Sequence, residues 1–121
     1  MKKILIVEDD PFIVDIYASQ LKGQGYNVDT ANAGEMALEK IKNNCPDLLL
    51  LDLLLPKMDG WEILKEMKKT KGMKSMPVII LSNLSQRAEV EKGLKMGAVK
   101  YLIKAHYTPS EVVDEIKKVI H

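Results

Sequence analysis

Short runs of apolar residues alternate five times along the chain with longer segments whose apolar positions recur every three or four residues. Most of the short runs are rich in Val, Ile and Leu, as in strands buried on both faces, and the longer segments have the spacing of amphipathic helices. The pattern predicts strands near residues 4–7, 26–31, 48–51, 78–81 and 101–103, and helices near residues 10–23, 34–43, 61–69, 85–96 and 109–120. Alternating strands and helices form parallel sheets through right-handed crossovers. Five such units predict an α/β domain with an open, doubly wound sheet, and they are too few for an eight-fold barrel.

Several helix boundaries are marked by residues that favour helix ends. Asp10 followed by Pro11 fits an N-cap and a first helical position, and Ser85 is the expected cap of the fourth helix. Thr108 and Glu111 have the spacing of a capping box. Glycines at positions 23, 25 and 97 are expected to end the first and fourth helices. Helical spacing predicts these inner-face residues for the first three helices: Ile13, Ile16, Tyr17, Leu21, Met36, Ala37, Leu38, Ile41, Trp61, Leu64 and Met67.

The composition narrows the class of protein. The chain has 121 residues with 18 basic and 17 acidic side chains. This balance lacks the excess of positive charge expected of a protein that binds nucleic acid or an anionic membrane directly. Nearly half of the residues are apolar and no composition shift marks a linker, so we expect residues 1–121 to form a single domain. The one cysteine, Cys45, favours a reducing compartment and is expected to be inert or partly buried. Without a signal peptide or an apolar span, we expect a soluble, cytoplasmic protein.

Five chemically distinctive residues directly follow predicted strands. Glu8 and Asp9 follow the first strand, Asp52 the third, Ser82 the fourth and Lys104 the fifth. In open α/β sheets, ligands bind at the carboxyl ends of the strands, so three carboxylates should meet at one edge. Like charges at close range resist ionisation, and a Mg²⁺ ion held by carboxylates, phosphate and water relieves the repulsion. Lys104 offers a positive charge for a phosphate oxygen, and Ser82 offers a hydroxyl donor.

This set of residues suits phosphoryl transfer to a carboxylate. The reaction requires a positioned nucleophile and neutralised phosphoryl oxygens. Asp52 is the candidate nucleophile, which would form an aspartyl phosphate. It interrupts the otherwise apolar run Leu48–Leu55, where no structural need for a charge is evident. Asp9 is expected to bind the metal directly, and Glu8 to bind it directly or through water.

Other polar residues are expected to have structural or solvated positions. Asp10 should cap a helix, and Asp59 should lie in a turn before the third helix. His106 and His121 lack partners at ligand spacing and are expected at the surface. The Lys-rich run at residues 65–74 is expected to be a solvated helix end and loop.

The motifs lie at positions that also identify a family. They are Ile6-Val7-Glu8-Asp9, Asp52 with Pro56 and Met58-Asp59-Gly60, Ile80-Leu81-Ser82, Gly97-Ala98, and Tyr101-Leu102-Ile103-Lys104. With them the sequence resembles, over essentially its whole length, the receiver domains of bacterial two-component response regulators, which include the chemotaxis regulator. The resemblance implies a flavodoxin-like fold with five helices and the strand order 2-1-3-4-5.

The resemblance implies a phosphorylation site with a bound metal. Asp52 matches the phosphoacceptor, and Glu8 and Asp9 match the acidic pair that binds Mg²⁺ together with Asp52. The backbone carbonyl of Leu54 matches a further protein ligand of the metal, and Mn²⁺ is expected to be able to replace Mg²⁺. Lys104 matches the phosphate-binding lysine. The implied activity is limited to self-phosphorylation from a phosphodonor and slow self-dephosphorylation, so the chain is not expected to be an enzyme in the ordinary sense.

The resemblance also implies a conformational switch and its partners. Ser82 matches the hydroxyl that moves toward the phosphate, and Tyr101 matches the aromatic residue that swings inward with it. Activation then remodels the face formed by the fourth helix, the fifth strand and the fifth helix. The expected donor is a histidine kinase or a phosphotransfer protein. The expected recipient of the signal is an effector protein or an output domain outside this chain.

The sequence departs from the family pattern at two positions. Ala105 stands where the family usually has a proline in a cis bond; because a cis bond before a non-proline residue costs about 3 kcal/mol, we predict a trans Lys104–Ala105 bond. Asn83 follows Ser82, where a small residue is usual, and could narrow access to Asp52 or contribute hydrogen bonds. Leu54 and Leu84 flank the site and cannot orient a hydrolytic water, which predicts a long-lived phosphoryl group.

Three other functions fit this sequence less well. A receiver-like module that only binds partners would not need the complete set of site residues. A nucleotide- or flavin-binding domain would need a phosphate-binding loop after the first strand, where this chain has three acidic residues. A phosphohydrolase with an aspartyl-phosphate intermediate usually needs a second carboxylate two residues after the nucleophile, and that position is Leu54.

Overall fold

The five strands form one parallel sheet. The computed structural model describes residues 1–70 and 75–120. The strands are β1 (Lys3–Val7), β2 (Asn27–Ala31), β3 (Leu48–Leu51), β4 (Val78–Ser82) and β5 (Lys100–Ile103). The helices are α1 (Pro11–Gly23), α2 (Gly34–Asn43), α3 (Gly60–Lys69), α4 (Arg87–Lys95) and α5 (Pro109–Val119), and a short 3₁₀ helix, Lys104–His106, follows β5. The strand order is β2-β1-β3-β4-β5, which confirms the predicted fold class and order.

The register of the central strands aligns their carboxyl ends. Val7 of β1 pairs with Ala31 of β2 and with Leu51 of β3, and Leu51 pairs with Ile80 of β4. Because all the strands are parallel, the residues that follow these pairs emerge at the same edge of the sheet. The segments predicted to carry the site are therefore neighbours.

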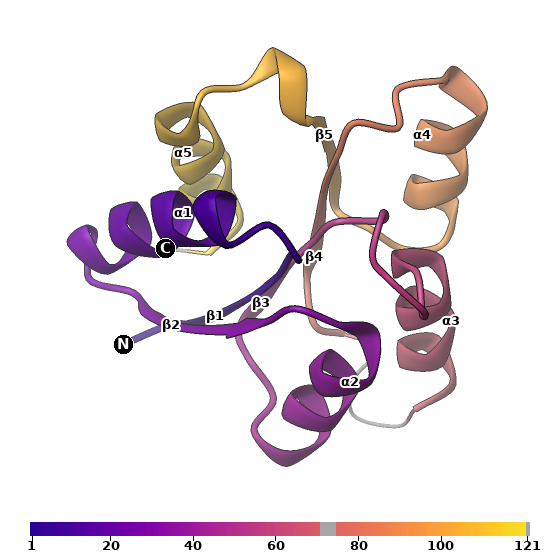
Figure 1. Ribbon diagram of the computed structural model, residues 1–121, viewed down its shortest axis with the longest axis horizontal. Coiled ribbons are helices and arrows are strands. Elements are labelled where there is room, and N and C mark those ends of the chain that lie inside the picture. The colour runs from indigo at the N-terminus through magenta and orange to yellow at the C-terminus, as the bar shows by residue number, and fades with distance from the viewer. Residues whose placement is uncertain (71–74, 121) are drawn as a thin grey trace.

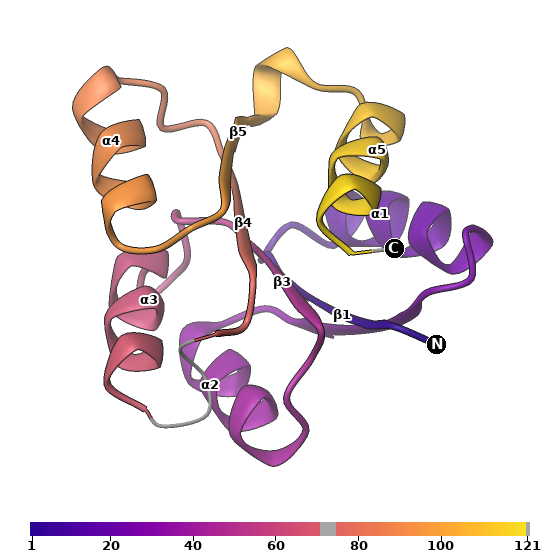
Figure 2. The same cartoon turned by 180° about the vertical axis from the view of Figure 1, so that it is seen from behind.

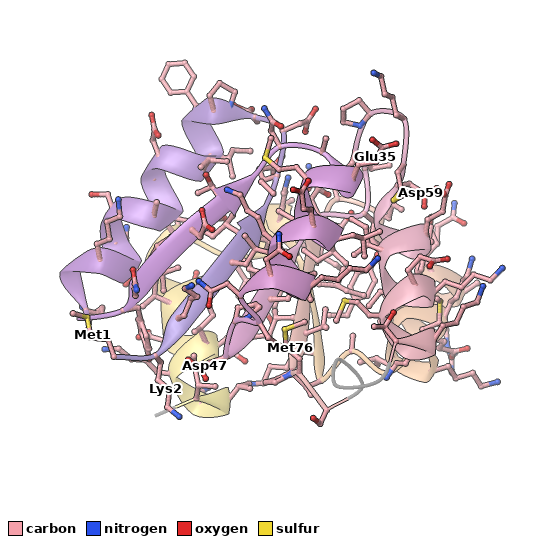
Figure 3. The ribbon with its side chains drawn as sticks, turned by 90° about the horizontal axis from the view of Figure 1, so that it is seen from below. Met1, Lys2, Glu35, Asp47, Asp59 and Met76 are labelled. Atoms are coloured by element: carbon pink, nitrogen blue, oxygen red, sulfur yellow. The ribbon has the colours of Figure 1, made fainter. Side chains whose placement is uncertain are left out.

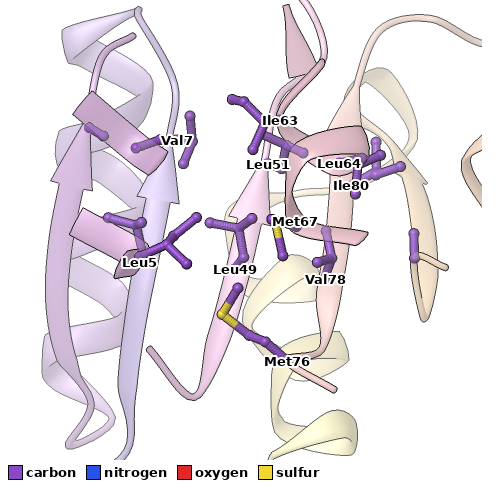
Figure 4. Close-up of a cluster of buried hydrophobic side chains, with 14 of the residues drawn as sticks. Leu5, Val7, Leu49, Leu51, Ile63, Leu64, Met67, Met76, Val78 and Ile80 are labelled. Atoms are coloured by element: carbon purple, nitrogen blue, oxygen red, sulfur yellow. The ribbon is translucent and has the colours of Figure 1, made fainter. Parts of the chain in front are cut away.

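Helices cover both faces of the sheet. Helices α1 and α5 lie on one face, and α2, α3 and α4 lie on the other (Figure 1 and Figure 2). The sheet separates two hydrophobic cores. The core under α1 and α5 includes Ile4, Ile6, Leu21, Leu50, Val112, Val113 and Ile116. The core under the other three helices (Figure 4) includes Leu5, Val7, Leu49, Leu51, Ile63, Leu64, Met67, Val78 and Ile80.

Two residues predicted on inner helix faces lie at the surface instead. Ile16 of α1 is 45% exposed and Met36 of α2 is 40% exposed. Both stand at the margin of an apolar stripe, where helical spacing gives the direction of a side chain but not the width of the surface that covers it. The other inner-face residues predicted for the first three helices are buried or half-buried.

Side chains cap three helices. The Asp10 carboxylate accepts a hydrogen bond at 3.0 Å from a backbone N–H in the first turn of α1, as predicted. Thr108 Oγ1 accepts from the Glu111 N–H at 3.2 Å, and Glu111 Oε1 accepts from the Thr108 N–H at 2.9 Å, which confirms the capping box of α5. Asp59, predicted as a turn residue, is the N-cap of α3.

The prediction that Ser85 caps α4 is wrong. The helix begins at Arg87, and Gln86 is its N-cap. The Gln86 backbone N–H donates to Glu89 Oε1 at 3.2 Å. Because Glu89 satisfies this backbone group three residues later, the helix starts after Gln86 and Ser85 stays in the loop.

Backbone geometry agrees with the predicted turns. Gly25 and Gly97 have φ angles of 91° and 107°, in the region that favours glycine, just after α1 and α4. No cis peptide bond occurs among the described residues, so the Lys104–Ala105 bond is trans, as predicted.

The amino ends of the strands form the edge of the sheet opposite the carboxyl ends and carry other side chains. The Lys3 N–H donates to the Asp47 carboxylate at 2.7 Å. Cys45, in the loop before β3, is exposed rather than partly buried, and its Sγ lies 3.9 Å from Met76 Sδ. Figure 3 shows Asp47 and Met76 at this end, away from Glu35 and Asp59.

The lysines of the run at residues 65–74 and the histidines lie at the surface where the structure describes them. In the Lys-rich run, the described lysines are exposed: Lys65, Lys68 and Lys69. His106 is also exposed, whereas residues 71–74 and His121 lie outside the described residues. Across residues 1–70 and 75–120, no helix has the length and apolar character needed to span a membrane.

Candidate functional site

Three carboxylates from two neighbouring strands meet at the carboxyl edge of the sheet. Glu8 and Asp9 follow β1 and Asp52 follows β3, and one oxygen of each lies within 4.8 Å of the others. Glu8 is 4% exposed and Asp52 is 5% exposed, whereas Asp9 faces solvent. The predicted meeting of these three residues is confirmed. Such a group of oxygen ligands suits a hard cation such as Mg²⁺.

The backbone on both sides of Asp52 is fixed by neighbouring elements. The Asp52 N–H donates to the Val7 carbonyl of β1 at 3.0 Å, and Asp52 Oδ1 accepts from the Leu54 N–H at 3.2 Å. The Gly60 N–H donates to the Leu53 carbonyl at 2.9 Å. A Cβ on Gly60 would lie 2.7 Å from the Asp52 carbonyl oxygen, so only glycine allows α3 to start this close to the site.

Lys104 places its ammonium group between the two buried carboxylates. Its Nζ contacts Glu8 Oε1 and lies 3.0 Å from Asp52 Oδ2. Glu8 Oε2 accepts hydrogen bonds from the N–H groups of Asp9 and Asp10 at 3.0 and 3.2 Å. Three carboxylates against one ammonium leave an excess of negative charge that one divalent cation would balance.

Burial governs the titration of this cluster. Loss of solvent raises the pKa of the Glu8 carboxyl group above its ordinary value, the Lys104 hydrogen bond opposes the rise, and the charge of Asp52 adds to it. Burial alone would lower the pKa of Lys104, but its hydrogen bond to Glu8 and the charge of Asp52 outweigh that effect and raise it. Mutual repulsion was the predicted reason for a carboxylate that resists ionisation; at Glu8, desolvation is the larger cause.

The two predicted switch residues are connected through Leu84. Ser82 is fully buried, and its Oγ accepts a hydrogen bond from the Leu84 N–H at 3.3 Å. The Tyr101 hydroxyl donates to the Leu84 carbonyl at 2.6 Å. Burial, followed by the charge of Glu89, raises the pKa of the Tyr101 phenol. Sequence analysis identified Leu84 only as an apolar neighbour of the site, because backbone hydrogen bonds leave no trace in a side-chain pattern.

Apolar side chains border the site. Leu54 is 53% exposed, and Leu84 is half-buried. Asn83, the residue after Ser82, is exposed. The structure thus places the two predicted flanking leucines and Asn83 on the segments that follow Asp52 and Ser82.

A buried tyrosine lies below the carboxylates. Tyr17 of α1 lines a cavity of about 10 Å³, at the lower limit for holding one water, together with Glu8, Asp52 and apolar side chains. Burial raises the pKa of the Tyr17 phenol. Sequence analysis assigned Tyr17 to the inner face of its helix but missed its proximity to the site, because helical spacing does not reveal how far along the sheet a side chain lies.

A family model and known proteins match nearly the whole chain. The family model of the response regulator receiver domain matches residues 4–117. The chain is 38% identical over 119 residues to the alkaline phosphatase synthesis transcriptional regulatory protein PhoP of Bacillus subtilis. The aligned region covers 98% of this chain and 48% of PhoP, so the chain spans about half the length of that relative. It is also 31% identical to the DNA-binding response regulator MtrA of Mycolicibacterium smegmatis, over 96% of this chain and 49% of MtrA.

Solved structures agree over nearly the full chain. Chemotaxis protein CheY4 of Vibrio cholerae matches with a TM-score of 0.91 and 28% identity, over 99% of both chains. The BeF3-activated N-terminal receiver domain of Klebsiella pneumoniae RstA matches with a TM-score of 0.84 and 30% identity, over 96% of both chains.

Proposed function

The chain belongs to the family of response regulator receiver domains of two-component systems, and we propose that it accepts a phosphoryl group on Asp52 in a reaction that requires Mg²⁺. The observation that carries the proposal is the position of the Asp52 carboxylate. It is 5% exposed at the carboxyl edge of the sheet, beside two further carboxylates and 3.0 Å from the Lys104 ammonium group. Burying a carboxylate beside two other carboxylates destabilises the folded state, and this cost favours a chemical role for Asp52.

In the proposed reaction Asp52 is the nucleophile. A carboxylate oxygen forms a bond to phosphorus while the bond from phosphorus to the donor breaks, and the leaving group keeps the electron pair. A histidine leaving group then takes a proton from solvent, whereas acetate leaves acetyl phosphate as the anion. Glu8, Asp9, Asp52 and the Leu54 carbonyl would hold Mg²⁺, or Mn²⁺ in its place, and the bound ion supplies positive charge for the phosphoryl oxygens. Lys104 exchanges part of its contact with Asp52 for a phosphoryl oxygen.

The proposed signal leaves the site through the α4–β5–α5 face. Ser82 would donate its hydroxyl to the phosphoryl group and shift the segment that it shares with Leu84. Because the Leu84 carbonyl also holds the Tyr101 hydroxyl, the shift would reach β5 and α4. A histidine kinase or phosphotransfer protein would be the donor. An effector protein or an output domain would read the face, and no direct contact of this chain with nucleic acid is proposed.

Intact mass tests the proposal directly. The folded chain is incubated with acetyl phosphate, with and without Mg²⁺, and its mass is measured. We expect one phosphoryl group to be added only with Mg²⁺, and no addition in Asp52→Asn. Asp47→Asn is the matched control, because it makes the same change at the opposite end of β3 and should be phosphorylated normally. Folded wild-type protein that gains no mass would contradict the proposal and favour a module that only binds partners.

We further propose that the phosphoryl group is long-lived. Leu54 is the exposed side chain nearest in sequence to Asp52 on the solvent side, and it cannot orient a hydrolytic water. Leu54→Asn should shorten the lifetime of the phosphoryl group, measured as the loss of added mass after the donor is removed. Leu94→Asn, at a similarly exposed leucine of α4, is the control and should leave the lifetime unchanged. Equal lifetimes in wild type and Leu54→Asn would refute this idea.

A further inference from the structure

Gly93 interrupts α4 at the point where the helix meets the sheet. It is the one buried residue of α4, and glycine inside a helix destabilises that helix relative to alanine. A Cβ at this position would lie 2.8 Å from Ile80 Cδ1 and 2.8 Å from Tyr101 Cδ2, closer than real Cβ atoms approach such neighbours. The low helix propensity of glycine is therefore offset at position 93, because any larger residue would occupy the space of the Tyr101 ring.

The Tyr101 ring occupies what we call the inward position. It lies against Gly93, and its hydroxyl donates to the Leu84 carbonyl at 2.6 Å. Leu84 in turn donates to Ser82 Oγ. The inward position is thus the arrangement in which β5 is hydrogen-bonded to the loop that leaves the candidate site.

We propose that Gly93 is a positioning residue that keeps the inward position of Tyr101 open before any phosphoryl group is bound, so that the switch is partly set in the resting protein. The inference rests on the proposed function for its consequence, although the ring position itself is independent of phosphorylation. Two neighbours would compete with a methyl group at position 93. Ile80 is fully buried in the sheet, so its side chain has no free space into which it could move. Tyr101 is only half-buried, so its ring can move toward solvent. The ring is the group that would leave.

Displacement of the ring should also weaken phosphorylation. If the phosphorylated state favours the inward position, then closing that position must disfavour the phosphorylated state to the same extent, because coupling between two sites is reciprocal. The expected effect on the equilibrium ratio of phosphorylated to unphosphorylated protein is at least about fivefold, the lower end of typical coupling between sites.

Fluorine NMR of protein labelled with fluorotyrosine, recorded without a phosphodonor, tests the ring position. The Tyr101 signal is assigned with Tyr101→Phe. In Gly93→Ala we expect this signal to move toward that of a solvent-exposed tyrosine. We also expect the equilibrium ratio of phosphorylated to unphosphorylated protein, measured with acetyl phosphate, to fall at least about fivefold. The double variant Gly93→Ala/Ile80→Val removes the crowding Cδ1 atom. It should move the Tyr101 signal part of the way back and restore part of the phosphorylation. Gly23→Ala is the matched control: it makes the same change in α1, where a Cβ would meet nothing within 4 Å, and should alter neither.

The outcomes separate this inference from the proposed function. An unchanged Tyr101 signal in folded Gly93→Ala overturns the inference, whether or not the protein can be phosphorylated. If Gly93→Ala does not fold, Gly93→Ala/Ile80→Val is compared with Ile80→Val, and an identical Tyr101 signal in those two overturns it. A displaced ring in a protein that acetyl phosphate never modifies supports the role of Gly93 in ring position and contradicts the proposed function alone.

Discussion

Helices α4 and α5 flank the same strand but are attached to the molecule in different ways. Helix α5 has a capping box and buries the branched side chains of Val112, Val113 and Ile116. Helix α4 buries only Gly93, which has no side chain, and its Leu94 is 46% exposed. One helix is anchored by side chains that fill the core, whereas the other has Gly93 as its one buried residue and Val90 half-buried.

The difference indicates which part of the proposed signalling face can move. Displacement of α5 would open a filled core, whereas displacement of α4 would expose little apolar surface. Besides its backbone contact, α4 has a cation–π contact in which Lys92 lies 4.4 Å from the centre of the Trp61 ring on α3. We therefore expect α5 to act as the fixed reference against which α4 shifts.

The largest expected effect is on stability. Ile116→Ala should lower the free energy of unfolding by about 3 kcal/mol, because it leaves a cavity in a filled core. Leu94→Ala, the nearest counterpart on α4, should cost less than about 0.5 kcal/mol, as for a surface substitution. Urea denaturation of both variants measures the difference. Equal losses would show that α4 is anchored as firmly as α5.

The second prediction concerns local opening. Backbone amides in the middle of α4 should exchange with solvent at least about tenfold faster than those in the middle of α5, because local opening of α4 exposes less buried surface. Hydrogen exchange followed by NMR or by mass spectrometry of peptides measures both helices in one sample. Slower exchange in α4 would reverse the comparison.

The third prediction concerns the helix caps. Thr108→Ala should lower stability by about 1 kcal/mol, because it removes the side-chain acceptor for the Glu111 N–H. Gln86→Ala at the start of α4 should cost less, about 0.5 kcal/mol, because the hydrogen bond from the Gln86 backbone N–H to the Glu89 side chain does not depend on the Gln86 side chain. Thermal unfolding of the two variants at one pH is sufficient to compare them.

The smallest effect concerns ion pairs and pH. Hydrogen bonds from Lys100 and then Lys118 hold the pKa of Glu115 on α5 below its ordinary value, so the native state is stabilised above the ordinary carboxyl pKa. That stabilisation is lost as pH falls through the lowered pKa. Glu115→Gln should cost about 0.5 kcal/mol at pH 7, and the difference from wild type should vanish in acid.

The matched change on α4 is Glu91→Gln. Arg87 and Glu91 form a pair whose side chains are 92% and 62% exposed, so this substitution should have no measurable effect at either pH. A pH-independent cost for Glu115→Gln would mean that lost packing, and not the ion pair, explains its effect.

Sequence pattern was sufficient for the fold because each strand–helix unit had its own strong signal. Ile4 to Val7 and Val78 to Leu81 were long enough and apolar enough to be identified without context, and parallel order then placed Glu8, Asp52 and Lys104 at one edge. The site could be predicted because its residues directly follow strands, so topology alone brings them together.

Features that depend on depth or on the backbone could not be predicted in this way. Ile16 and Met36 have helical spacing but lie beyond the edge of the core. Ser85 is a good cap residue, yet Gln86 is used because Glu89 lies three residues further on. Gly93 was not singled out from the sequence, because the tyrosine ring that it contacts lies eight residues later and only the folded chain brings the two together.

Cys45 gives the molecule a natural point of attachment. The chain has one thiol, it is exposed, and it lies before β3 at the end of the sheet opposite Asp52. A fluorophore or a surface linked there would orient every copy in the same way, with the acidic edge directed away from the support. The protein can therefore be immobilised or labelled at a defined position without any engineered residue, while the carboxyl edge of the sheet stays unobstructed.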